Sequence, residues 1–332
     1  MPLLAIQDLT LDFASGGKSV RALDHVSLTV NEGETVCLVG ESGSGKTVTA
    51  MSVARLLPTP PAQYSGGKIV IGGGDVLSMT KRELRAVRGA VVNYVFQDPG
   101  AALNPVFRVG QQILESLKLH QPEHATEAEV IRLLTMVGIP APEIRARSYP
   151  HQMSGGMQQR IMIAMAIATR PKLLIADEPT TALDVTIQAQ ILKLLRDLQK
   201  QLGMGILLIT HNLRVVQEVA DRVAVMYAGQ VVEQGNVAEV CARPHHPYTR
   251  ALLKAVPEIG AGKERLLAIP GTPPQLGSWP TGCHFHPRCP QRQHDCDEKE
   301  PALIPTLGER RARCMYWELT PAPNEEFHGC GD

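Results

Sequence analysis

The chain is organised around the stretch Gly40-Glu-Ser-Gly-Ser-Gly-Lys46-Thr47, which has the form GxxxxGK[ST] of a phosphate-binding loop. The apolar run before it, Thr35-Val-Cys-Leu-Val39, predicts a short buried strand, and residues 48–57 after it predict a helix. The glycines let successive backbone N–H groups turn toward phosphate oxygens, and the start of a helix adds partial positive charge. We expect Lys46 to reach the β- and γ-phosphates and the Thr47 hydroxyl to bind Mg²⁺. The stretch therefore predicts a site for a nucleoside triphosphate.

The composition limits the class of protein. A chain of 332 residues suggests one large domain and a smaller one. Its 33 basic and 33 acidic residues balance, so a large polyanion such as DNA is not an expected partner. The longest apolar run, residues 161–168, is far shorter than the ~20 residues that span a bilayer, and residues 1–8 do not resemble a signal peptide. We expect a soluble, cytoplasmic protein.

The segments that flank the phosphate loop have different patterns. Residues 3–39 alternate apolar and polar positions in short pieces (4–6, 9–13 and 26–30) between turn residues, which predicts an antiparallel β layer. Phe13, in one of these strands, is either a base-stacking residue or an aromatic of the sheet. Residues 98–150 contain no strand pattern and predict a helical insertion, in which Thr126 and Glu129 resemble a capping box.

Polar residues follow two further predicted strands. Asp177 and Glu178 end an apolar run, where open α/β sheets bind their ligands, so Asp177 fits a Mg²⁺ carboxylate and Glu178 a base for the attacking water. The alternative is that these two acids are merely solvated residues at the end of a buried strand. His211 directly follows the predicted strand 205–210 and is a candidate to contact the γ-phosphate. Ser154 is a candidate N-cap of a helix whose first amides are left uncovered by two glycines, which offers a second anion site.

Together these motifs resemble the nucleotide-binding subunit of an ABC transporter over roughly residues 3–255. The segment 40–47 resembles the Walker A loop and Gln97 the Q-loop, and residues 154–158 resemble the signature that is usually written LSGGQ. Residues 173–178 look like Walker B with the catalytic glutamate, 182–184 like the D-loop, and His211 like the switch histidine. Met157 departs from the glutamine that many relatives have in the signature.

The resemblance implies a fold, a reaction and partners. The expected fold is an α/β P-loop NTPase of the ABC type with an antiparallel β layer, a helical subdomain at about 98–155 and a small Cys-rich C-terminal extension. Glu178 and His211 would be catalytic, and Mg²⁺ would bind through Thr47, Gln97 and Asp177. The nucleotide would contact Phe13, Gly40, Ser42, Gly43, Ser44, Gly45, Lys46, Thr47, Gln97, Ser154, Gly155, Gly156, Met157, Gln158 and Asp184. ATP sites in the family form between two such subunits, and we expect a paralogous partner, two transmembrane permease subunits and an extracytoplasmic substrate-binding protein.

The C-terminal part of the chain narrows the resemblance to one group within this family. Residues 246–253, 267–271 and 283–290 resemble the C-terminal extension of dipeptide and oligopeptide importer ATPases, a group that also serves nickel, glutathione and metallophore uptake. We therefore divide the chain into an ATP-binding domain, 1–255, and a C-terminal extension, 256–332. The implied role is a peripheral ATPase on the cytoplasmic side of the cell membrane. An ABC ATPase that acts on nucleic acid or ribosomes, and a P-loop kinase, fit less well, because a long coiled-coil insertion is missing and a kinase would not need residues 154–158.

Five of the seven cysteines lie in the last fifty residues. Four of them have the spacing C-x5-C-x6-C-x17-C: Cys283, Cys289, Cys296 and Cys314. Because this segment has little apolar core, we expect it to need a cross-link, such as a bound metal, to be stable. Four thiolates in a reducing compartment suggest zinc or an iron–sulfur cluster, and the resemblance favours [4Fe–4S]. Zn²⁺ and free or oxidised thiols remain the alternatives, with His284 and His286 as substitute ligands, and Cys330 is expected to be a spare thiol.

Overall fold

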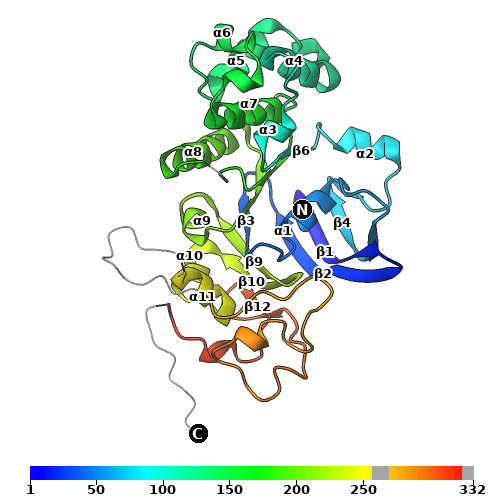
Figure 1. Ribbon diagram of the computed structural model, residues 1–332, viewed down its shortest axis with the longest axis vertical. Coiled ribbons are helices and arrows are strands. Elements are labelled where there is room, and N and C mark those ends of the chain that lie inside the picture. The colour runs from blue at the N-terminus through cyan, green and yellow to red at the C-terminus, as the bar shows by residue number, and fades with distance from the viewer. Residues whose placement is uncertain (182, 256–268, 324–332) are drawn as a thin grey trace. The chain divides into compact units, whose positions relative to one another are not determined.

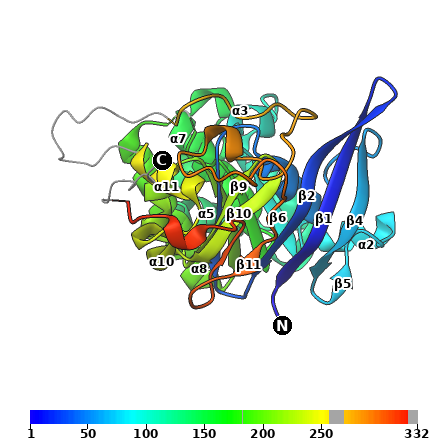
Figure 2. The ribbon, with the colours of Figure 1, turned by 90° about the horizontal axis from the view of Figure 1, so that it is seen from below.

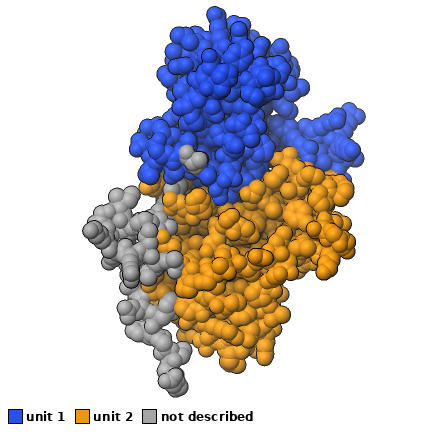
Figure 3. Space-filling view, viewed as in Figure 1, with its two compact units in different colours: residues 1–4, 30–34, 71–209 blue, residues 5–29, 35–70, 210–332 orange. Residues whose placement is uncertain are grey.

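The computed structural model describes residues 1–181, 183–255 and 269–323. It consists of two compact units that interleave in the sequence (Figure 3). Unit 1 contains residues 1–4, 30–34 and 71–209, and unit 2 contains residues 5–29, 35–70 and 210–332. Ala182 of the predicted D-loop, Cys330 and residues 267–268 lie outside the described residues.

Three long strands of unit 2 form the expected antiparallel layer. The strands β1 (Leu4–Ser15), β2 (Lys18–Val30) and β4 (Ala62–Ile71) lie side by side in the order β2-β1-β4 (Figure 2). β1 and β2 are joined by Gly16 and Gly17, whose φ angles of 57° and 78° suit a tight hairpin turn that other residues rarely adopt. The short pieces predicted from the sequence are therefore parts of two continuous strands. A two-residue strand, β5 (Gly74–Asp75), follows β4 along the chain.

A second group of strands in unit 2 supports the phosphate loop. The fully buried β3 (Thr35–Val39) is parallel to β9 (Arg222–Tyr227), and β9 forms a hairpin with β10 (Gln230–Asn236). β10 pairs on its other side with β12 (Arg311–Ala312), which pairs with β11 (Ile304–Pro305). The C-terminal extension thus adds strands to the same sheet. The helices of this unit are α1 (Lys46–Val53), α9 (Leu213–Val219), α10 (Val237–Ala242) and α11 (Pro247–Lys254), with 3₁₀ turns η3 (His286–Arg288) and η4 (Trp317–Leu319).

Unit 1 is built on three parallel strands. These are β6 (Val92–Val95), β7 (Leu173–Asp177) and β8 (Gly205–Thr210), with β7 in the middle. Every residue of β7 and β8 is buried, as expected for parallel strands with both faces covered. Unit 1 also contains the helices α2 (Lys81–Val87), α7 (Gly155–Ile167) and α8 (Val185–Leu202).

The helical insertion is confirmed. It contains α3 (Pro99–Ala102), α4 (Val109–His120), α5 (Glu127–Met136) and α6 (Pro142–Ala146), with 3₁₀ turns η1 (Pro122–His124) and η2 (Pro150–Gln152). Figure 1 shows α4, α5 and α6 gathered beside α7, and α4 contacts all three of these neighbours. Thr126 caps α5 by accepting a hydrogen bond from the Glu129 amide, but the Glu129 carboxylate pairs with Arg132 instead of closing the capping box. In the described part of the chain, no helix is long and apolar enough to cross a membrane.

Candidate functional site

The phosphate loop connects the C-terminal end of β3 to the start of α1, as the motif requires. Gly43 and Gly45 adopt φ angles of 79° and 104°, a region that side chains with a Cβ rarely enter. At Gly40, an added Cβ would collide with the Met226 carbonyl, and at Gly45 it would come within 2.9 Å of Leu23 Cδ2. These glycines are therefore required by the course of the backbone and by its close packing on β9 and β2.

Two polar side chains inside the loop are suited to phosphate. The Lys46 ammonium is buried and donates hydrogen bonds to the carbonyls of Gly40 and Glu41, each at 2.9 Å. The hydroxyl oxygen of Ser44 is buried and has no hydrogen-bond partner among the described residues. Because buried polar groups are nearly always paired, the buried hydroxyl of Ser44 and the buried ammonium of Lys46, both in this loop, are suited to an anionic ligand.

The acidic residues lie at the C-terminal end of β7. Asp177 is buried, and its Oδ2 accepts a 2.7 Å hydrogen bond from the Tyr94 hydroxyl on β6. Burial, followed by the charge of Asp177, raises the pKa of Tyr94, so this hydroxyl stays protonated and donates.

Glu178 follows Asp177 in a strained conformation, with a φ of 44°. A non-glycine residue in this region costs about 1–3 kcal/mol and is commonly found at functional sites. Its carboxylate accepts hydrogen bonds from the Thr181 hydroxyl at 2.8 Å and from the Gln97 amide at 3.4 Å. The structure therefore brings Gln97 and Glu178 together, as two polar groups following β6 and β7.

The signature segment opens α7 as expected. Ser154 is the N-cap, and its hydroxyl accepts a 3.4 Å hydrogen bond from the Met157 amide, while Ser154 and Gly155 are exposed. The Gln158 side chain donates to the carbonyls of Pro150 and Met153, so it fixes the preceding turn. Met157 is half-buried.

The remaining candidates lie at element ends. Asp184 caps α8 by accepting a 2.9 Å hydrogen bond from the Ile187 amide. His211 directly follows β8 and is exposed, and Phe13 is a half-buried residue near the end of β1. Thr47 is the second residue of α1 in unit 2, whereas Gln97 and Asp177 belong to unit 1.

The four clustered cysteines surround one small cavity. Cys283, Cys289, Cys296 and Cys314 line a space of about 20 Å³ together with Phe285, and further lining residues are His246, Pro247, His286, Gln291 and Tyr316. Burial raises the pKa of Cys289 and of Cys314 to about 12 and also raises that of Cys283. His284 does not line this cavity, and its Nδ1 donates to the Ala228 carbonyl at 3.0 Å. Among the described residues, no three His, Cys, Asp or Glu side chains are placed to hold a single metal ion.

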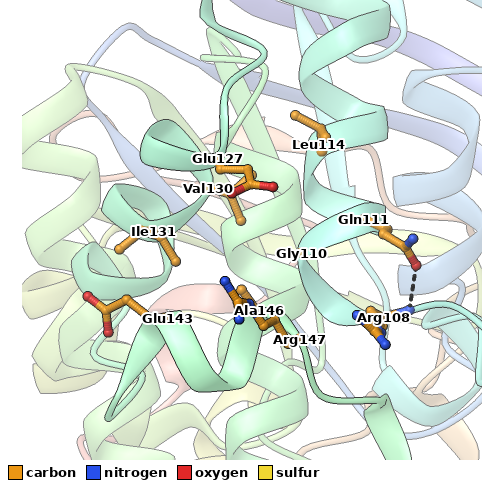
Figure 4. A pocket seen from close by; sticks show the side chains of 10 residues that line it. All are labelled: Arg108, Gly110, Gln111, Leu114, Glu127, Val130, Ile131, Glu143, Ala146 and Arg147. Carbon is orange, nitrogen blue, oxygen red and sulfur yellow. Dashed lines mark hydrogen bonds between the residues drawn. The ribbon is translucent and has the colours of Figure 1, made fainter.

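A larger cavity lies within the helical insertion (Figure 4). Its volume is about 310 Å³, and its lining residues are Arg108, Gly110, Gln111, Leu114, Glu127, Val130, Ile131, Glu143, Ala146 and Arg147. Three exposed apolar residues are sequence neighbours of this lining: Val106, Phe107 and Ile144 are 72 %, 51 % and 65 % exposed. The cavity therefore combines charged residues of both signs with apolar surface.

Sequence reasoning missed several of these contacts. Nothing in the pattern indicated that Tyr94 would hold Asp177, because an aromatic in a buried strand is ordinary. Nor did it indicate that Tyr248 and Arg288 would contact Glu41, since they follow it by 207 and 247 residues. Only a folded chain brings such distant positions together.

Comparisons with known proteins identify the family. A family model described as ABC transporter matches residues 23–181, and one described as oligopeptide/dipeptide transporter, C-terminal region, matches residues 232–296. The oligopeptide transport ATP-binding protein OppD of Bacillus subtilis (strain 168) is 49 % identical over 98 % of this chain and 91 % of its own length. The dipeptide transport ATP-binding protein DppD of Escherichia coli (strain K12) is 48 % identical over 95 % of this chain and 97 % of its own.

Solved structures agree on the fold. The dimeric, post-hydrolysis structure of the ATP-binding cassette MJ0796 bound to ADP and Pi aligns with a TM-score of 0.62 at 27 % identity, covering 70 % of this chain and 98 % of that one. cbiO1 from Clostridium perfringens, part of the ABC transporter complex cbiONQ, aligns with a TM-score of 0.62 at 29 % identity, covering 72 % and 90 %. The expected ABC-type P-loop fold is thereby confirmed, and the chain belongs to the ABC transporter family, among the ATP-binding proteins related to OppD and DppD.

Proposed function

We propose that this protein hydrolyses ATP to power the import of dipeptides or oligopeptides through separate membrane permease subunits. The observation that carries the proposal is the phosphate loop, in which the buried Lys46 ammonium is held by the Gly40 and Glu41 carbonyls and the buried Ser44 hydroxyl has no hydrogen-bond partner among the described residues. Its relatives are named as oligopeptide and dipeptide transport proteins, which supports a peptide as the cargo.

In this proposal, different residues bind the nucleotide, hold Mg²⁺ and activate the attacking water. Lys46 and the loop amides bind the phosphates, and Phe13 stacks on the base. Thr47, Gln97 and Asp177 would hold Mg²⁺, which neutralises charge on the phosphates when it is bound. Their oxygens are the ligand type that Mg²⁺ prefers. Glu178 accepts a proton from the attacking water, and Gln97 and Thr181 orient its carboxylate.

A second subunit completes the site in this proposal. The start of α7, residues 154–158, is exposed at Ser154 and Gly155. In the proposed dimer this segment faces the nucleotide bound by the partner, and Asp184 contacts the nucleotide as well. His211 contacts the γ-phosphate. We expect the partner to be a paralogous ATP-binding subunit, so that ATP closes a heterodimer and hydrolysis opens it.

The helical insertion is the part that contacts the permease. Its cavity of about 310 Å³ and the exposed apolar residues Val106, Phe107 and Ile144 offer a surface for a short apolar segment. Placed there, the chain works as a peripheral subunit on the cytoplasmic side of the membrane. An extracytoplasmic substrate-binding protein supplies the peptide, so the cargo never contacts this chain.

Two substitutions test the assignment of base and phosphate ligand. Glu178→Gln keeps ATP binding but lowers the rate of ATP hydrolysis about a hundredfold or more, because the proton acceptor is lost. Lys46→Ala loses ATP binding itself. Glu32→Gln, at an exposed turn, is the matched control and keeps both properties. Hydrolysis by Glu178→Gln at the wild-type rate would show that another residue activates the water.

We further propose that the four cysteines hold a [4Fe–4S] cluster. Supporting this proposal, the four thiols line one cavity, and cysteine thiolates are the usual ligands of such clusters. Burial raises the pKa of the Cys289 and Cys314 thiols, and bound iron would supply positive charge that favours their thiolate forms. Such a cluster would link the cysteine-containing segments of the extension to one another and stabilise its fold.

Metal analysis tests the cluster. Protein purified without oxygen is expected to contain about four irons per chain and to absorb visible light. Cys289→Ser loses both signals, whereas Cys241→Ser, at a buried cysteine outside the cavity, keeps them. About one zinc per chain and no iron would contradict the cluster and support Zn²⁺.

A further inference from the structure

Glu41 is an unexpected residue at its place in the phosphate loop. Its backbone amide donates a 2.8 Å hydrogen bond to the Tyr248 hydroxyl, and its carbonyl accepts from the Lys46 ammonium. Nothing in phosphate binding requires a carboxylate here, and a negative charge so close to a polyphosphate site opposes the binding of the ligand. The carboxylate therefore needs a partner that neutralises it.

That partner is Arg288 of the C-terminal extension. Its Nη1 lies 2.7 Å from Glu41 Oε2 and its Nη2 lies 3.0 Å from Oε1, a bidentate pair. The Arg288 side chain is only 4 % exposed and the Glu41 side chain 24 %. Paired, hydrogen-bonded and largely shielded from water, this contact is of the strong class rather than a surface ion pair.

Arg288 is itself held in place from several sides. Its Nε donates to the Pro270 carbonyl at 2.8 Å and its Nη1 to the Tyr227 hydroxyl at 3.3 Å. Phe285, 1 % exposed, packs edge-on against Tyr227 with ring centroids 5.2 Å apart and also contacts Tyr248 at 5.4 Å. One aromatic cluster thus supports both residues that hold Glu41, Arg288 on its carboxylate and Tyr248 on its backbone.

We propose that Arg288 is a positioning residue for ATP: it neutralises Glu41 and keeps that carboxylate away from Lys46 and from the phosphates. The proposal rests on the phosphate loop being the ATP site. Without Arg288, the free carboxylate would repel the polyphosphate and compete with it for the Lys46 ammonium. The C-terminal extension thereby acts directly on nucleotide affinity.

The test measures the Kd of a fluorescent ATP analogue in the full chain. Arg288→Met is expected to raise this Kd about tenfold, equivalent to about 1.4 kcal/mol, with little change in kcat at saturating ATP. The rise shrinks between about 50 mM and about 500 mM salt, because screening weakens the repulsion. Adding Glu41→Gln to Arg288→Met recovers the affinity to within about threefold of the wild type, since the unpaired charge is removed.

Two further variants separate this role from a structural one. Arg288→Lys keeps the positive charge and disturbs folding less than Arg288→Met does. It is expected to bind the ATP analogue with a Kd at most about threefold higher than that of the wild type. Arg292→Met removes a neighbouring, half-exposed arginine that pairs with Asp297, and leaves binding unchanged. Wild-type affinity in Arg288→Met, or a loss that Glu41→Gln deepens and salt does not reduce, overturns the proposal. ATP binding by Lys46→Ala would instead contradict the proposed function.

Discussion

Side-chain hydrogen bonds fix the orientation of the acidic residues at the end of β7. Tyr94 donates to Asp177, and Thr181 and Gln97 donate to Glu178, so neither carboxylate rotates freely. Hydrogen bonds from neighbouring side chains are known to orient metal-binding carboxylates and to hold catalytic bases in one position. The positive φ of Glu178 adds backbone strain at the same place.

Tyr94→Phe is expected to raise the Mg²⁺ concentration that ATP hydrolysis requires, because Asp177 is a proposed Mg²⁺ ligand. The substitution removes the hydroxyl donor from buried Asp177, and losing such a partner costs about tenfold or more in metal affinity. The measurement is the Mg²⁺ concentration that gives half-maximal ATP hydrolysis, with Tyr149→Phe in the helical insertion as the control. An unchanged Mg²⁺ requirement would contradict a role of Tyr94 in holding Asp177.

The residues foreseen from the sequence are those of local motifs. The loop 40–47, the caps Ser154 and Thr126 and the strand-end acids follow from short spacings, which depend on backbone geometry alone. Contacts such as those of Arg288 with Glu41 join distant positions through side chains and leave no local pattern.

At the scale of elements, β10 supports a buried carboxylate that links it to the start of α11. Glu233 is fully buried, and its two oxygens accept hydrogen bonds from the amides of His245 and His246 at 2.7 and 2.9 Å. Burial raises the pKa of Glu233 to about 7, although these amides lower it. Burial also lowers the pKa of His245 to about 4 and that of His246 to about 3.

Glu233→Gln is expected to change how stability depends on pH. Below about pH 4.5 Glu233 is protonated in both states, and between about 4.5 and about 7 the folded state binds the extra proton. Its contribution to the free energy of unfolding is therefore lost as the pH rises through this interval. The advantage of the wild type over Glu233→Gln should shrink by on the order of 3 kcal/mol between pH 4.5 and 8.

Chemical denaturation at several pH values measures this difference. The two histidines are present in both proteins, so their titration does not separate the curves. Glu239→Gln, an exposed carboxylate on α10, is the control and follows the wild type. A difference that stays constant with pH would mean that Glu233 titrates at its ordinary pKa.

Most elements were predictable because their patterns are local. β3 matches its predicted range, β7 and β8 match buried apolar runs, and the insertion is helical as expected. The long hairpin β1–β2 was predicted in pieces, because polar positions interrupt the apolar pattern along its exposed face. The two-residue strand β12 was not foreseen, since its pairing with β10 is set by tertiary structure.

At the scale of the molecule, the C-terminal extension belongs to the same unit as the phosphate loop. β12 pairs with β10, Arg288 pairs with Glu41, and Arg313 donates to the Val231 carbonyl, so the extension is built into this unit at several places. The model of the oligopeptide/dipeptide transporter C-terminal region matches residues 232–296 and so spans the division at residue 255 that we draw from the sequence, and residues 210–332, on both sides of that division, belong to one compact unit. The extension is therefore a structural part of the ATP-binding unit.

The central claim is that this chain converts ATP hydrolysis into peptide import, and uptake by reconstituted vesicles tests it most directly. Vesicles that contain permease subunits, the paralogous ATP-binding subunit that we propose as the partner, and this chain are supplied with ATP and with a labelled dipeptide on the binding protein. The account predicts that peptide accumulates with the wild-type chain and that accumulation is lost with Glu178→Gln, which still binds ATP. Equal accumulation with both chains, or none with the wild type while ATP is being hydrolysed, would contradict it.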